Sequence, residues 1–216
     1  MRRLTHILMP ASLLIALVMP AGVAAQEEEL AAARAATEPF RDVAAAEEAG
    51  YGLPPEGPLH ECIANLDGPG AMGFHWINGD LVGDTELDPA TPEALVYAPT
   101  ADGGLELVAL EYVVFAEAWD ADNDMAPMLF DEMFMLVEEP NRYELPAFYA
   151  LHAWVWQDNP DGVFANFNPD VSCEAVPDTA MPSAPVAGVP VALLGALALA
   201  AATAWAARGR RTRRRG

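Results

Sequence analysis

Three side chains with metal-binding chemistry stand out in this chain: His75, Glu111 and His152. Both histidines lie inside short segments rich in aromatic and β-branched residues, which is typical of strands. Glu111 lies in segment 105–115, where strand alternation places every second residue on one face. The other residues on that predicted face are apolar: Leu105, Leu107, Ala109, Val113 and Phe115. A carboxylate in such surroundings needs a cation, a hydrogen-bond donor or a proton.

Two imidazoles and one carboxylate form a ligand set for a divalent transition metal such as zinc, copper or iron. Such a site leaves a coordination position open for water or another ligand. The spacing alone is not diagnostic, because the chain has neither a His-x-His pair nor a His-Glu-x-x-His helix. The alternative is that each histidine is hydrogen-bonded to backbone and that a β-bulge turns Glu111 away. No serine motif or glycine-rich phosphate loop identifies a catalytic residue.

The elements that would position these residues can be read from the hydrophobic pattern. Residues 26–48 have helical spacing, Pro39 predicts a kink or a new start with Thr37 as N-cap, and Gly50 ends the pattern. Strand-like segments follow at 72–77, 94–98, 105–115 and 148–156. Because no long helical pattern separates them, we expect antiparallel pairing. The predicted fold is α+β: an N-terminal helix packed on a small antiparallel sheet or partly closed barrel, plus a C-terminal transmembrane helix.

Cys62 and Cys173 are the only cysteines in the chain. In an exported domain, two thiols most often form a disulfide. The bridge would connect the loop after the helical segment to the end of the last folded segment. The alternative is a cysteine metal site, for which His60 is the only neighbouring ligand.

The charge is negative and strongly segregated. All 32 acidic residues lie within residues 27–178, where three arginines are the only basic residues, so that this segment carries a formal charge of −29. An acidic surface excludes a nucleic-acid binder, which needs positive charge against phosphate. A hydrophobic content of 53% excludes a disordered acidic tail.

The two ends have the patterns of targeting segments. Residues 1–25 combine Arg2 and Arg3, an apolar run and the small residues Val23 and Ala25, which predicts a signal peptide removed before Gln26. Residues 186–207 carry no charge and would span ~33 Å as a helix, enough to cross a bilayer. The arginine-rich tail at 208–216 would stay in the cytoplasm. Residues 26–175 would then be an acidic extracellular domain of a single-pass cell-surface protein.

The Pro/Ala-rich linker at 176–185 begins with a short motif: Val176, Pro177, Asp178, Thr179 and Ala180. With the apolar segment and basic tail behind it, this motif resembles a sortase-type cell-wall sorting signal of the form Leu-Pro-x-Thr-Gly. Val176 and Ala180 depart from that pattern. The resemblance implies cleavage after Thr179 and attachment to the cell wall; the alternative is a permanent membrane anchor.

Within the domain, five stretches resemble an uncharacterised family of secreted bacterial proteins: 42–51, 70–76, 110–114, 151–164 and 171–173. The resemblance covers most of residues 37–173 and implies a stand-alone extracellular domain. It includes the three metal-ligand candidates and Cys173, and it implies no activity.

The sequence therefore predicts a surface-anchored extracellular binding domain of unknown ligand that holds a divalent transition metal. An extracellular metal-dependent enzyme is one alternative. A structural or adhesive cell-surface protein, whose acidity keeps it soluble, is the other.

Overall fold

The computed structural model describes residues 21–174. Most of the predicted signal peptide, the sorting motif, the apolar segment and the basic tail lie outside the described residues, and these four assignments stay predictions. Among residues 21–174, no helix has the length and apolar character needed to cross a membrane.

The N-terminal segment is helical with the predicted interruption at Pro39. Helix α1 (Ala21–Thr37) is followed by a 3₁₀ turn η1 (Glu38–Arg41) and helix α2 (Val43–Glu48). Thr37 occupies the predicted N-cap position at the start of η1, but its hydroxyl donates to the Ala33 carbonyl one turn back and does not cap η1, whereas the Asp42 side chain caps α2. Pro39 forces the break because its ring cannot continue the α-helical hydrogen bonding.

Helix α1 contacts the rest of the domain along one narrow face. Gln26, Leu30, Ala33 and Thr37 recur at helical spacing and are the partly or fully buried positions of α1. Gln26, the predicted first residue of the mature chain, donates to the Phe130 carbonyl at 2.6 Å. The helix begins at Ala21 in the full chain, because the small residues before Gln26 extend it.

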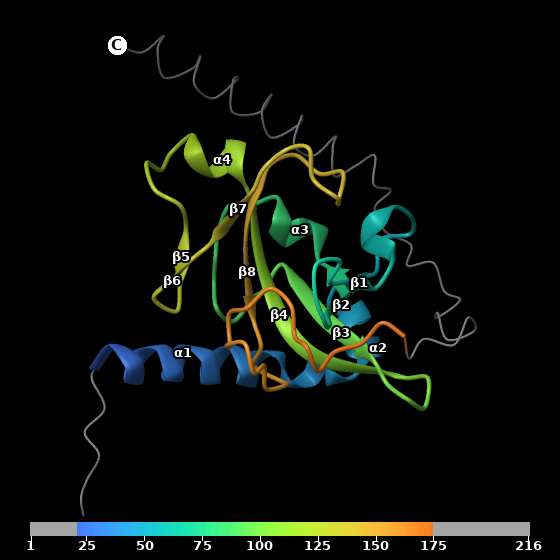
Figure 1. Ribbon diagram of the computed structural model, residues 1–216. Coiled ribbons are helices and arrows are strands. Elements are labelled where there is room, and N and C mark those ends of the chain that lie inside the picture. Colours follow the sequence, from blue (N-terminus) through green and yellow to red (C-terminus); the bar gives the residue numbers. More distant parts are fainter. Residues whose placement is uncertain (1–20, 175–216) are drawn as a thin grey trace, which may run out of the picture.

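Six strands form one antiparallel sheet in the order β1-β2-β3-β4-β8-β7. Their bounds are β1 (Ile63–Ala64), β2 (Ala71–Ile77), β3 (Ala94–Pro99), β4 (Leu105–Phe115), β7 (Met135–Val137) and β8 (Phe148–Ala153). A separate hairpin pairs β5 (Met128–Leu129) with β6 (Glu132–Met133). Three short helical turns complete the fold: η2 (Pro58–His60), α3 (Gly79–Val82) and α4 (Ala116–Asp120). The sheet curls into a half-barrel (Figure 1), which confirms the predicted α+β class and antiparallel pairing.

A β-bulge in β4 changes which residues share a face with Glu111. Val96 pairs with Ala109 but the next residue of β3, Tyr97, pairs with Leu107, so that Val108 is the extra residue. Leu107 therefore packs in the same cluster as Leu110 and not on the face of Glu111. The predicted uniform alternation along 105–115 is wrong before the bulge and correct after it, because a bulge reverses the facing of every preceding residue.

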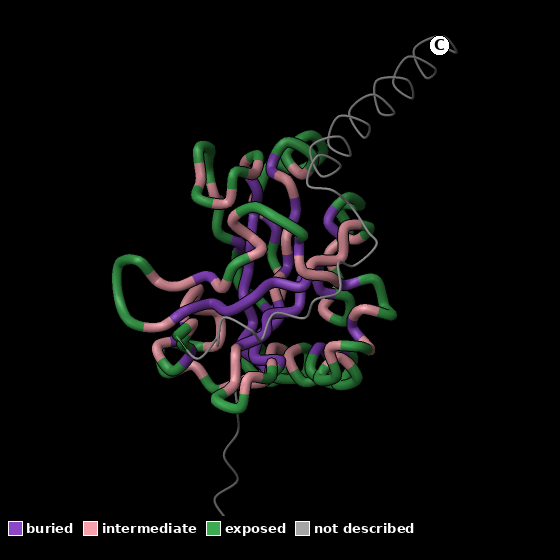
Figure 2. The backbone as a smooth tube through the Cα atoms, turned by 90° about the vertical axis from the view of Figure 1, so that its right-hand side faces the viewer, coloured by how far each residue is buried: buried purple, intermediate pink, exposed green. Residues whose placement is uncertain are grey.

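The helices cover the sheet face that carries Trp76, Tyr97 and Leu110, where Ala33 and Ala46 join the core. The Tyr97 hydroxyl donates to the Phe40 carbonyl at 2.6 Å, and the Trp156 indole donates to the Thr37 hydroxyl at 3.1 Å. Figure 2 shows the buried segments running through the middle of the molecule, with exposed loops outside. The opposite sheet face carries His75, Glu111 and His152.

Cys62 and Cys173 form the predicted disulfide across 111 residues. The bridge connects the segment just before β1 to the last described turn of the chain. Together with Ala71, Val96 and Trp154, Cys173 belongs to a second apolar cluster near one end of the sheet.

Candidate metal centre

The strand register brings the three predicted ligands together. Glu111 of β4 lies directly opposite His152 of β8. His75 lies on β2, and β3 separates it from β4. Between β3 and β4, Ala94 pairs with Glu111 and Val96 pairs with Ala109. Because His75 pairs with Val96, Val96 with Ala109 and Glu111 with His152, the register places all three candidate ligands on one face of the sheet.

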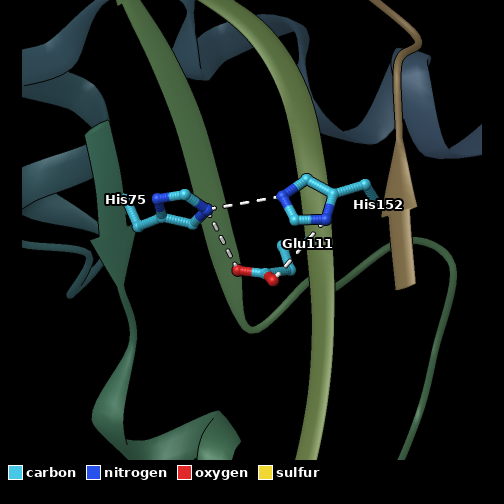
Figure 3. Close-up of side chains that lie close together, drawn as sticks. All are labelled: His75, Glu111 and His152. Atoms are coloured by element: carbon cyan, nitrogen blue, oxygen red, sulfur yellow. Dashed lines mark hydrogen bonds and ion pairs between the residues drawn. The ribbon is translucent and has the colours of Figure 1, made fainter. Parts of the chain in front are cut away.

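The three side chains point toward one another (Figure 3). His75 Nε2 lies 3.2 Å from Glu111 Oε2 and 3.4 Å from His152 Nε2, and His152 Nδ1 lies 3.6 Å from Glu111 Oε1. One ligand atom from each residue fits within a mutual separation of 4.8 Å. Ligands about 2.0–2.2 Å from a tetrahedral ion are ~3.3 Å apart. The two contacts of His75 Nε2, with Glu111 Oε2 and with His152 Nε2, are close to this value, which makes the cluster a candidate site for a shared metal ion.

Burial controls the protonation of all three groups. Each imidazole is 2% exposed, and desolvation lowers the pKa of His75 to about 4 and of His152 to about 3, with the His75 charge adding to the latter effect. The backbone of Gly73 offsets part of the His75 shift. Burial also raises the pKa of Glu111 to about 8. At neutral pH the histidines are uncharged, the state in which imidazole binds metals.

Glu111 has no arginine partner within residues 21–174, where its carboxyl group instead contacts the two uncharged imidazoles. Arg142 donates instead to the Ala64 carbonyl at 3.1 Å and lies over the Tyr143 ring. His60 is separate from the cluster, since its Nδ1 is 2.6 Å from the Pro54 carbonyl on the η2 loop. The three side chains predicted as ligands, His75, Glu111 and His152, thus lie together in the structure, and their binding of a metal stays a prediction.

A pocket of about 60 Å³ opens beside the three side chains. Its walls are mainly aliphatic and aromatic side chains from the sheet and the covering loops, including Leu59, Ile77, Val113, Phe115, Val137 and Phe148. Three polar residues line it as well: Glu93, Tyr143 and Asn166.

The sequence reading missed Glu93, which is 1% exposed. Its Oε2 accepts a hydrogen bond from the Val113 backbone at 3.0 Å, and burial raises its pKa to about 8, with a smaller contribution from Asp84 and Glu111. Its position directly before a strand pattern was the available signal. Strand alternation could not show that the Glu93 side chain faces the pocket, because Glu93 comes just before β3 begins.

Tyr143 was missed too, because it comes from a loop without periodicity. Burial raises the pKa of its hydroxyl to about 12, with a smaller effect of Glu111. That hydroxyl lies 3.8 Å from the Met72 sulfur.

No known family model, curated protein or solved structure matches this chain. Its function is therefore inferred from the geometry and chemistry of its own residues.

Proposed function

We propose that residues 26–175 form an extracellular, surface-anchored domain that binds a divalent transition metal through His75, Glu111 and His152. The convergence of three ligand atoms from strands β2, β4 and β8 carries the proposal. These residues are far apart in the chain, and one possible ligand atom from each lies within 4.8 Å of the others.

A hydrogen-bonded core cluster explains the same residues less well. The nitrogen-to-oxygen contacts of 3.2 and 3.6 Å lie at or beyond the usual limit of an N–H···O bond, which is about 3.2 Å. Two Nε2 atoms also face each other, so that one must donate to the other. A shared cation would engage both Nε2 atoms and the carboxylate at once.

The donor set favours a metal that accepts imidazole and carboxylate together, such as zinc, copper, iron or nickel. Thiolate ligation is not part of the proposal, because Cys62 and Cys173 are bonded to each other.

Elemental analysis of the purified full chain, after equilibration with Zn²⁺ or Co²⁺ and removal of excess ion, tests the site. We expect about one equivalent of metal in the wild type and less than a tenth of that in His75→Ala and in His152→Ala. His60→Ala is the matched control and should keep full occupancy, because His60 lies outside the cluster. Absence of stoichiometric metal in the wild type would reject the site and favour the structural or adhesive alternative.

The surface location rests on the sequence patterns at the ends and is supported by the disulfide, since such bonds persist in oxidising compartments. Fractionation of the native cells tests it. We expect an impermeant surface label to react with the protein on intact cells. If the sorting motif is processed, Thr179→Ala should move the protein from the cell-wall fraction to the membrane fraction. Equal membrane retention of wild type and Thr179→Ala would indicate a permanent membrane anchor, and a reduced protein in the cytosol would contradict export.

The pocket favours a second candidate, metal-dependent catalysis, because an open metal position beside an apolar cavity can activate water. A screen with small ester and amide substrates addresses it. Turnover should need the bound metal and should be lost in His152→Ala; turnover that survives metal removal would not come from this site.

A further inference from the structure

The pocket beside the metal-ligand candidates has more room than a metal and one water need. A single water occupies roughly 10–15 Å³ of such a volume, and the pocket has about 60 Å³. Its size suits a molecule of ~4–5 non-hydrogen atoms. The three ligand side chains form one wall, so that an ion bound there would have its open position toward this space.

The walls select for an uncharged, partly apolar occupant. Ile77, Val113, Phe115 and Phe148 bring hydrocarbon into contact with the space, and Ala150 leaves part of it unfilled. A cation would lose its hydration against these groups without compensation, and an anion would be compensated only at the metal itself. The acidic surface further opposes the approach of anions.

Two hydrogen-bond donors of the wall are paired with weak acceptors. The Tyr143 hydroxyl lies 3.8 Å from the Met72 sulfur, and the Asn166 amide nitrogen lies 3.4 Å from the Met135 sulfur. All four residues line the pocket. Thioether sulfur is a weak acceptor, so that either donor gains by turning to an oxygen or nitrogen of a bound molecule.

We propose that the pocket binds a small uncharged molecule that coordinates the metal through one lone-pair nitrogen, oxygen or sulfur atom and packs its apolar part against the walls. The proposal rests on the metal site proposed above. It adds the size, charge and donor chemistry of the ligand.

The full chain loaded with Co²⁺ provides the test, since the visible spectrum of Co²⁺ responds to a new ligand. At pH 8 we expect saturable spectral change with imidazole, at least tenfold weaker binding of benzimidazole, which is too large, and at least tenfold weaker binding of acetate, which is charged. Equal binding of all three probes would overturn the proposed selectivity.

Two pocket-filling variants locate the binding. Ala150→Leu and Val113→Phe should keep Co²⁺ affinity within about threefold of the wild type and lower imidazole affinity at least tenfold. Ala121→Leu, an exposed substitution outside the pocket, is the matched control. Unchanged imidazole binding in both filled variants would overturn the assignment to this pocket. If only one variant folds, its result decides.

The outcomes separate the two proposals. Co²⁺ binding without any imidazole response in the wild type would overturn the ligand pocket and leave the metal site standing. Failure of Co²⁺ to bind at His75, Glu111 and His152 would overturn both.

Discussion

At the residue scale, four titratable groups line one largely apolar pocket: His75, His152 and Glu93, which are buried, and Glu111, which is partly buried. Desolvation keeps each of them in its uncharged form over part of the physiological pH range. Without a bound cation, the cluster is therefore stable only as a set of neutral groups. A divalent ion reverses this preference for Glu111, because a carboxylate ligand must be ionised.

The metal-free protein should be most stable near pH 5.5. The lowered histidine pKa values, about 4 and 3 against an ordinary 6.5, contribute stability that is complete above pH 6.5 and is lost as pH falls through the folded values. The raised pKa values of Glu93 and Glu111, about 8 against 4.5, contribute stability that is complete below pH 4.5 and is lost as pH rises through 8. Urea unfolding with a chelator from pH 3 to 9 measures the resulting maximum.

Glu93→Gln tests the alkaline side of that profile separately. Removing one buried carboxyl should reduce the loss of unfolding free energy between pH 6 and 8 by roughly 1.4 kcal/mol per pH unit. Glu117→Gln removes an exposed carboxyl from α4 and should leave the slope unchanged. An identical slope in wild type and Glu93→Gln would mean that Glu93 does not titrate as its burial requires.

At the element scale, the backbone of β2 is irregular at Gly73, two residues before His75, where it lies close to β3. Gly73 has φ +119°, and a Cβ added there would lie 2.5 Å from the Tyr97 carbonyl oxygen of β3. Glycine is therefore needed at this position both for its backbone conformation and for the close approach of β3. The register between β1 and β2 is also irregular beside it.

Gly73→Ala should be more destabilising than Gly162→Ala. Gly162 has the same φ of +119° but nothing within 4 Å of an added Cβ, so that it isolates backbone strain from steric clash. We expect Gly162→Ala to cost about 1–2 kcal/mol and Gly73→Ala at least about 2 kcal/mol more. Urea unfolding gives both values, and Gly73→Ala should also lower metal occupancy. Equal costs would show that β3 moves away without penalty.

At the scale of the whole molecule, one disulfide and a large negative charge act on stability in opposite directions. The bridge restricts the unfolded chain over a loop of 111 residues. The acidic residues repel one another more in the compact state than in the unfolded chain.

Replacing both cysteines by serine should lower the unfolding free energy by about 2–5 kcal/mol. The bridge also anchors the segment that brings Leu59 and Ile63 over the pocket, so that the dissociation rate of bound metal should rise in the same variant. Thermal unfolding and chelator-competition kinetics measure the two effects. Unchanged values for both would assign the bridge no role in the fold.

The melting temperature should rise as sodium chloride increases from 0.02 to 0.5 M, because screening weakens the repulsion among the carboxylates. Calorimetry at pH 7 measures the shift. A flat or falling melting temperature would contradict a net repulsive surface.

The sequence by itself determined the features that depend on local pattern. Runs of apolar, aromatic and β-branched residues between turn-rich segments located β2, β3, β4 and β8, Pro39 located the break in the helical segment, and the presence of just two cysteines identified the bridge. The grouping of His75, Glu111 and His152 as candidate metal ligands followed from residue type and strand position.

Tertiary structure alone decided the features that depend on residues meeting across the chain. Strands β1, β5, β6 and β7 have two or three residues each, too few for a periodic pattern, and form only because longer strands offer partners. The bulge at Val108 is set by its pairing with β3, which alternation within β4 cannot report. Glu93 and Tyr143 join the pocket because the chain returns there, and the convergence of three distant ligands is fixed by the register of the sheet.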